Sequence, residues 1–113
     1  MHELAITQSM FDLVLEQAKE AEAKKVGKIN LVIGEMTGVV SDCVQFYFDF
    51  ISKGTLAEGA TLSFVMVPPK AKCQGCEKLF ELKEFDWTCP HCGDSNLQIV
   101  AGEELFVESI EVE

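Results

Sequence analysis

The residues with the most specific chemistry are four cysteines in two closely spaced pairs. Cys73 and Cys76 form one Cys-x-x-Cys pair, Cys89 and Cys92 form the other, and twelve residues separate the pairs. Two intervening residues allow a tight turn to aim both thiolates at one ion, and four thiolates complete the closed tetrahedral coordination of a structural Zn(II) site. We therefore expect these four cysteines to bind zinc.

Other possibilities at this site stay open at the level of sequence. Iron also accepts a tetrahedral set of thiolates, so a rubredoxin-like electron carrier is an alternative. His91 lies inside the second pair, either as a solvent-facing turn residue or as a replacement ligand. Cys43 stands alone far upstream and is expected to be a small buried apolar residue. An odd number of cysteines, four of them in Cys-x-x-Cys pairs, indicates metal binding in a reducing compartment rather than a disulfide scaffold.

The first three residues, Met1-His2-Glu3, offer a second set of metal ligands. The α-amine, a deprotonated amide nitrogen and the imidazole of His2 can form fused chelate rings around one ion. Nitrogen donors in a tetragonal arrangement suit Ni(II) or Cu(II), and Glu3 adds a donor through its amide nitrogen or its carboxylate. A solvated, frayed terminus without a metal is the alternative interpretation.

Composition excludes several classes of function. The chain has 113 residues, 19 acidic against 9 basic side chains and a net charge of −10, and every basic side chain is a lysine. This balance argues against nucleic-acid binding and against an anionic membrane surface. No apolar run approaches the ~20 residues that span a bilayer, and the first residues lack the basic region followed by an apolar stretch that is typical of a secretory signal, so we expect a cytoplasmic protein. The sequence carries no Ser-His-Asp set and no phosphate-binding glycine loop, which predicts that it is not an enzyme.

Hydrophobic periodicity predicts the elements that position these ligands. We expect helices over residues 2–25 and 41–53, and strands over residues 28–35, 61–67, 98–100 and 105–112. Ser41 or Asp42 should cap the second helix with its side chain, and Phe46 and Phe50 should widen the buried stripe of that helix. The alternation slips near Glu108-Ser109, which predicts a β-bulge or a strand buried on both faces.

These elements predict an α+β fold: a small mixed three-stranded sheet with two helices, plus an inserted four-cysteine zinc-ribbon-like lobe. Residues 1–67 and 98–113 are expected to form an α/β base domain, with residues 68–97 as the inserted zinc-binding domain. The inserted segment has few apolar residues, so metal binding should contribute much of its folding free energy.

Taken together, several short motifs resemble the HypA family of hydrogenase maturation proteins, which are nickel metallochaperones. These motifs are Met1-His2-Glu3-Leu4, Ile33-Gly34-Glu35, the two cysteine pairs, Gly102-Glu103-Glu104-Leu105 and Ser109-Ile110-Glu111-Val112. The resemblance covers essentially the whole chain. It implies that the base domain is a nickel domain built from both termini, with Ni(II) carried by Met1, His2 and Glu3.

The resemblance also implies partners. Family members hand Ni(II) to the large subunit precursor of [NiFe]-hydrogenase, and they work with a HypB-type GTPase. Some relatives use an acidic side chain near the start of the second helix as a nickel ligand, and Asp42 is the nearest candidate here. We expect a monomer or a weak homodimer. The alternative function is a zinc-ribbon protein–protein interaction module without an exchangeable metal.

Overall fold

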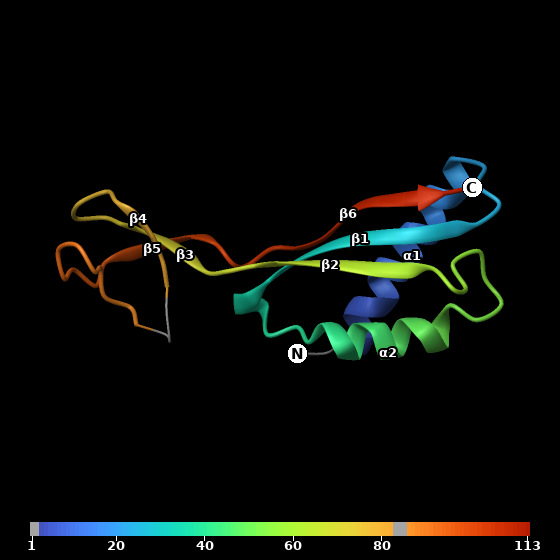
Figure 1. The fold of residues 1–113 in the computed structure, drawn as a ribbon, viewed down its shortest axis with the longest axis horizontal. Coiled ribbons are helices and arrows are strands. Elements are labelled where there is room, and N and C mark those ends of the chain that lie inside the picture. Colours follow the sequence, from blue (N-terminus) through green and yellow to red (C-terminus); the bar gives the residue numbers. More distant parts are fainter. Residues whose placement is uncertain (1–2, 83–85) are drawn as a thin grey trace.

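The computed structural model describes residues 3–82 and 86–113, which form an elongated molecule with two separate sheets. Its extents are 55 × 24 × 17 Å and its radius of gyration is 17.7 Å, whereas a compact chain of this length has a radius of gyration of about 13 Å. Figure 1 shows two parts joined by a narrow waist. In order, the elements are α1 (Glu3–Glu20), β1 (Val26–Gly34), the 3-10 helix η1 (Glu35–Thr37), α2 (Ser41–Ile51), β2 (Thr61–Val67), β3 (Lys70–Cys73), β4 (Leu79–Glu81), β5 (Leu97–Ala101) and β6 (Leu105–Val112).

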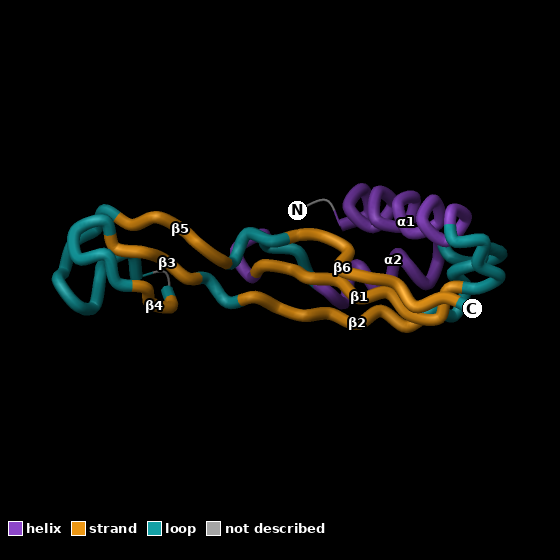
Figure 2. Tube along the Cα trace, turned by 90° about the horizontal axis from the view of Figure 1, so that it is seen from above, coloured by secondary structure: helices purple, strands orange, loops and turns teal. Residues whose placement is uncertain are grey.

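The larger part is a three-stranded sheet with the strand order β2-β1-β6. Strand β1 pairs with β2 in parallel and with β6 in antiparallel orientation. Both helices lie on the same face of this sheet, as Figure 2 shows. The expected small mixed sheet with two helices is therefore confirmed. Within the described residues, no helix has the length and apolar character needed to cross a membrane.

Alternating side chains of β1 explain why this sheet binds the two helices. Ile29, Leu31 and Ile33 are buried on one face of the strand, as the period of two in a β-strand requires. Phe11 of α1 and Phe48 of α2 cover them, and the two rings meet edge to face with centroids 6.2 Å apart. The core of the molecule thus lies between the sheet and the helices.

A second three-stranded sheet, β4-β3-β5, forms the smaller part. Both of its strand pairs are antiparallel. Strand β5 accounts for the expected strand at residues 98–100, and it pairs with β3 in the smaller sheet. The domain boundaries at residues 67/68 and 97/98 stay a prediction, and β5 begins at the second of them.

The waist between the two sheets depends on glycines. A Cβ atom at Gly34 would overlap the carbonyl group of Gly102 and lie 2.6 Å from the backbone nitrogen of Glu103. Gly102 itself has a φ of +110°, and a Cβ there would lie 2.8 Å from the Cα of Pro69. Backbones approach this closely only where a side chain is absent. The crossing at Gly102 is therefore packed directly against the end of β1, and the crossing at Pro69 is packed against Gly102.

Several local expectations are confirmed or corrected. The β-bulge is confirmed, because Asn30 pairs with Ser109 while the next residue, Leu31, pairs with Val107, which leaves Glu108 as the extra residue. The first helix ends at Glu20 rather than at residue 25. The backbone turns there into the left-handed region, with a φ of 54° at Glu22.

The second helix differs from expectation at two places. Val40 occupies the N-cap position, and within the described residues no side chain donates or accepts a capping hydrogen bond there, so capping by Ser41 or Asp42 was wrong. Phe46 and Phe50 do not widen the buried stripe: they are 69% and 71% exposed. The helix rests on the core through the buried Val44 and Phe48, with the half-buried Ile51 beside them.

Candidate metal centre

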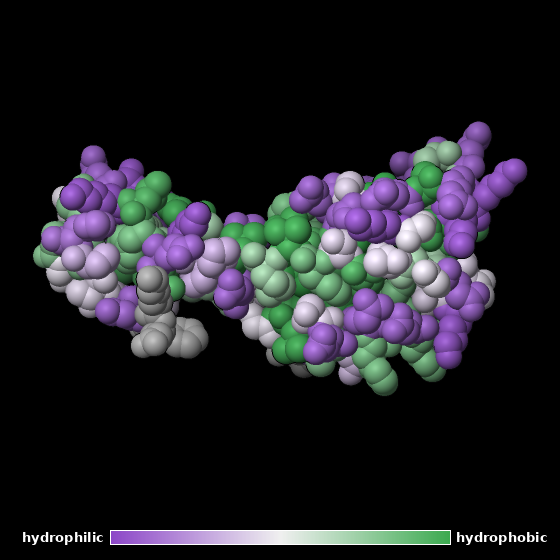
Figure 3. Space-filling model, viewed as in Figure 1, coloured by the Kyte–Doolittle hydropathy of each residue, from purple (hydrophilic) through white to green (hydrophobic). Residues whose placement is uncertain are grey.

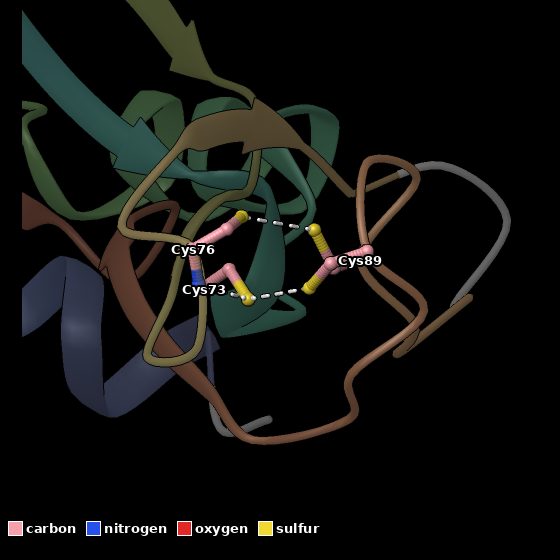
Figure 4. A group of neighbouring side chains, drawn as sticks. Cys73, Cys76 and Cys89 are labelled. Atoms are coloured by element: carbon pink, nitrogen blue, oxygen red, sulfur yellow. Dashed lines mark hydrogen bonds between the residues drawn. The ribbon is translucent and has the colours of Figure 1, made fainter.

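The four paired cysteines converge at one end of the smaller sheet. Their Sγ atoms all lie within 4.8 Å of one another. The Sγ atoms of Cys73 and Cys92 are 3.4 Å apart, and those of Cys76 and Cys89 are 3.7 Å apart. A tetrahedral ion with metal–sulfur bonds of 2.3 Å requires sulfur–sulfur distances of roughly 3.8 Å. The arrangement, part of which is shown in Figure 4, has the size of a four-thiolate metal site.

Backbone amides support the first cysteine of each pair. The N–H of Cys76 donates to the Sγ of Cys73 at 3.5 Å, and the N–H of His91 donates to the Sγ of Cys89 at 3.4 Å. Gly93 closes the second pair with a φ of +77°, a conformation that glycine adopts without steric cost. Each Cys-x-x-Cys pair therefore forms a tight turn around its sulfur atoms.

Contacts between the two turns hold them in register. The N–H of Gln74 donates to the carbonyl of Asn96 at 2.9 Å. Gly75 leaves room for the second turn, since a Cβ there would lie 2.7 Å from the Oδ2 atom of Asp94. The two turns thus meet backbone to backbone, and the four sulfur atoms face one another.

The thiols strongly perturb one another. Burial raises the pKa of Cys89, but N–H donors of Cys92 and His91 outweigh it and lower that pKa to about 7. The backbone N–H of Asp94 lowers the pKa of Cys92, whereas the neighbouring thiol of Cys73 and burial raise it, with a result of about 12. Four thiolates this close repel one another unless a cation lies between them. A divalent metal ion meets that requirement.

Of the described residues, Cys43 and His91 do not join this four-cysteine cluster. His91 is exposed in the turn and contributes its backbone N–H to the site, which confirms the solvent-facing interpretation. Cys43 is half-buried near the start of α2 rather than fully buried as expected. Among the described residues, few apolar side chains support the smaller sheet: Leu82 is buried, but Leu79 and Trp87 are exposed, and Phe85 lies outside the described residues. This agrees with a segment whose folding depends on a metal.

The N-terminal ligand set is described only from its third residue. Met1 and His2, two of the three expected nickel ligands, lie outside the described residues. Glu3 is half-buried and begins α1. The hydroxyl of Thr7, a fully buried side chain, donates to the carbonyl of Glu3 at 2.6 Å. The start of the helix is thereby anchored to the core.

Asp42, the acidic candidate from the second helix, is exposed in the first turn of α2. Figures 1 and 2 place the starts of α1 and α2 at the same end of the larger sheet, towards the waist. The two helices also contact each other. Glu3 and Asp42 therefore belong to the same end of the larger part, the end that faces the waist.

Comparisons with known proteins agree on one family. A family model described as "Hydrogenase/urease nickel incorporation, metallochaperone, hypA" matches residues 1–112. A protein of Caldanaerobacter subterraneus subsp. tengcongensis named hydrogenase maturation factor HypA is 46% identical over 114 residues, which cover all of both chains. A protein of Dehalococcoides mccartyi with the same name is 43% identical over all of this chain and 95% of its own length.

Solved structures show the same fold. A solution structure of a HypA protein superposes with a TM-score of 0.75 at 25% sequence identity, covering 100% of this chain and 97% of the other. The solution structure of the Ni metallochaperone HypA from Helicobacter pylori gives a TM-score of 0.67 at 24% identity, with 99% and 97% of the two chains covered. The two sheets and two helices described above are thus an arrangement already known in solution.

Proposed function

The chain belongs to the HypA family of hydrogenase maturation factors and nickel metallochaperones, and from this premise we propose that it binds Ni(II) at its N-terminus and delivers it to the large subunit precursor of [NiFe]-hydrogenase. The observation that carries the proposal is the family match over residues 1–112, which includes the starting Met1-His2-Glu3. We propose that the protein works in the cytoplasm and is not itself an enzyme.

The proposed nickel ligands are Met1, His2 and Glu3. The α-amine, an amide nitrogen and the imidazole supply nitrogen donors of the kind that Ni(II) prefers. The anchored carbonyl of Glu3 supports this assignment, because the hydrogen bond from Thr7 fixes the point from which the two preceding residues extend. A short segment on a fixed anchor loses less conformational entropy on binding an ion than a free tail does.

The proposed zinc ligands are Cys73, Cys76, Cys89 and Cys92. A closed set of four thiolates retains its ion, whereas a site built from a terminal amine and an imidazole can exchange its ion with a partner. This division suits a carrier: zinc stabilises the smaller sheet and nickel is the cargo. In this proposal the smaller sheet, β4-β3-β5, belongs to the zinc domain, and the larger sheet, β2-β1-β6, with its two helices forms the nickel domain.

In this proposal a partner protein, and not this chain, hydrolyses the nucleotide. The sequence has no phosphate-binding glycine loop, so any energy from GTP must come from another protein, and we assign this part to a HypB-type GTPase. The acidic chain, with a net charge of −10, suits partners whose docking surfaces are basic.

Extension of the N-terminus by two residues tests this proposal. An added Gly-Ser turns the α-amine of Met1 into a peptide nitrogen and moves the free α-amine two residues away from the imidazole of His2. Nickel binding measured by calorimetry should therefore be lost while the zinc content stays unchanged. The same two residues added after Glu113 serve as the control and should leave nickel binding intact. If the N-terminally extended protein binds nickel as the control does, the terminal site is wrong and the alternative of a zinc-ribbon interaction module is favoured.

A further inference from the structure

The four cysteines of the cluster differ in their access to solvent. Cys73 and Cys89 are buried, Cys76 is half-buried and Cys92 is exposed. Strand β3 runs from the waist to Cys73 and β5 runs back from Leu97, so the cluster lies at the end of the smaller sheet that is away from the larger part (Figure 1). Figure 3 shows that the narrow waist separates the two parts, and the larger part does not cover this end. A dissolved oxidant therefore has most access to Cys92.

Sulfur contacts join the exposed cysteine to a buried one. The Sγ atom of Cys92 lies 3.4 Å from the Sγ atom of Cys73, which belongs to the other Cys-x-x-Cys pair. The turn of the first pair holds this partner sulfur in place, because the N–H of Cys76 donates to the Sγ of Cys73 at 3.5 Å. A thiolate that solvent does not reach thus faces the one that solvent does reach.

We propose that Cys92 is an oxidation site for hydrogen peroxide, and that its oxidation leads to a disulfide with Cys73 and to release of zinc. The susceptibility of a cysteine to peroxide follows its thiolate character and its exposure. All four ligands are thiolates when a metal is bound, so exposure distinguishes Cys92 from the rest. The inference rests on the proposed zinc ligands and does not involve nickel.

The oxidation proceeds in two steps that balance. The thiolate of Cys92 attacks one oxygen of the peroxide, an S–O bond forms, the O–O bond breaks, and hydroxide leaves a sulfenic acid on the sulfur. The thiolate of Cys73 then attacks this sulfur, an S–S bond forms, the S–O bond breaks, and a second hydroxide leaves. The two thiolates lose two electrons in total and the peroxide gains them. Zinc keeps its oxidation state throughout.

Loss of two ligands accounts for release of the ion. Only the thiolates of Cys76 and Cys89 remain, and they do not complete the four-coordinate site that retains zinc. The sulfur atoms of Cys73 and Cys92 have to approach from 3.4 Å to the bond length of about 2.05 Å. The new bond joins the same two turns that the ion joined, so we expect zinc to bind again after reduction.

Peptide mapping of zinc-loaded, full-length protein treated with an equimolar amount of hydrogen peroxide tests the assignment. Trypsin cleaves after Lys72, Lys78 and Lys83, so the two Cys-x-x-Cys pairs fall in different peptides. A disulfide between Cys73 and Cys92 links these peptides, whereas a disulfide within either pair leaves them separate. In a parallel sample, dimedone added with the peroxide should label Cys92 before the other three ligands.

Zinc release is the second measurement, made with a chromogenic chelator that is too weak to take zinc from the reduced protein. One zinc ion should leave for each disulfide formed, and dithiothreitol should restore zinc binding. Cys43→Ser is the matched control, because Cys43 lies on α2 outside the cluster, and it should release zinc as the wild type does. Cys92→His keeps a zinc ligand at this position without the exposed thiolate, so release should slow about tenfold.

Three results would overturn the proposal. They are zinc that stays bound after peroxide treatment, disulfides confined to the Cys-x-x-Cys pairs, and dimedone labelling that begins at a cysteine other than Cys92. Mapping of the wild type decides the site of oxidation even where Cys92→His binds no zinc. The zinc content before oxidation tests the proposed zinc ligands separately, so a protein that holds zinc and retains it in peroxide refutes this inference alone.

Discussion

The contact between Gly34 and Gly102 predicts a large difference between two glycine substitutions in one strand. β1 contains Gly27 near its start and Gly34 at its end. A Cβ at Gly27 would make an ordinary contact, 3.7 Å from the carbonyl oxygen of Glu111, whereas a Cβ at Gly34 would overlap the backbone of the waist. We expect Gly34→Ala to destabilise the protein and Gly27→Ala to leave it nearly unchanged.

The magnitude follows from the bonds around the overlap. The N–H of Gly34 donates to the carbonyl of Glu104 at 2.6 Å, and the N–H of Met36 donates to that of Gly102 at 2.8 Å. A new methyl group at position 34 would push the backbone at Gly102 away and lengthen both hydrogen bonds. The loss costs about 1 kcal/mol for each bond. Displacement of the packed backbone adds about 1–3 kcal/mol. The free energy of unfolding should therefore fall by roughly 3–5 kcal/mol for Gly34→Ala.

Urea denaturation followed by helical circular dichroism measures this difference. The helices pack on the larger sheet, whereas the single tryptophan, Trp87, lies between β4 and β5 of the smaller sheet, so fluorescence would report on a different region. Gly27→Ala should change the free energy of unfolding by less than about 1 kcal/mol, because alanine also restricts the unfolded chain. Equal stabilities of the two variants would refute the close packing of the waist against β1.

Three further predictions concern the core, the cysteines and the anchor of the N-terminus. Phe48→Ala should lower the free energy of unfolding by about 3–5 kcal/mol because the ring is fully buried. Phe46→Ala in dilute monomeric protein should change the free energy of unfolding by less than about 0.5 kcal/mol. Equal effects of the two substitutions would contradict the assigned faces of α2. Cys89→Ser should reduce the bound zinc measured by mass spectrometry, and Cys43→Ser should retain it; loss of zinc from both would place Cys43 at the site. Thr7→Val removes the hydrogen bond to the carbonyl of Glu3. It should lower the free energy of unfolding by about 1 kcal/mol and weaken nickel binding several-fold. Unchanged nickel affinity would show that this hydrogen bond is not needed to position the nickel ligands.

Patterns that depend on neighbours in sequence predicted the larger sheet well. The strands at residues 61–67 and 105–112 have the expected bounds, because alternation of apolar side chains is set by the pleat of the strand. The bulge at Glu108 was also predicted, since an extra residue shifts that alternation. The two Cys-x-x-Cys pairs predicted a cluster that the structure brings together, because the turn within each pair is local.

Features that depend on tertiary packing were not predictable from the same patterns. Phe46 and Phe50 are aromatic at helical spacing, yet α2 covers the sheet with only one side, so they are exposed. Strand β5 pairs with β3 in the smaller sheet. The residues of β5 alone do not indicate which of the two sheets the strand joins. The close contact of Gly34 with Gly102 joins positions far apart in sequence, and a glycine alone does not reveal whether it serves a turn or a close approach.

Calorimetric titration of Ni(II) into zinc-loaded, tag-free protein tests the central claim most directly. The chain has two histidines, His2 and His91, which provide a matched pair of variants. Wild-type protein and His91→Ala should each bind one nickel ion, and His2→Ala should lose that binding. Equal binding by all three proteins, or loss of nickel from His91→Ala instead, would contradict a nickel site at the N-terminus.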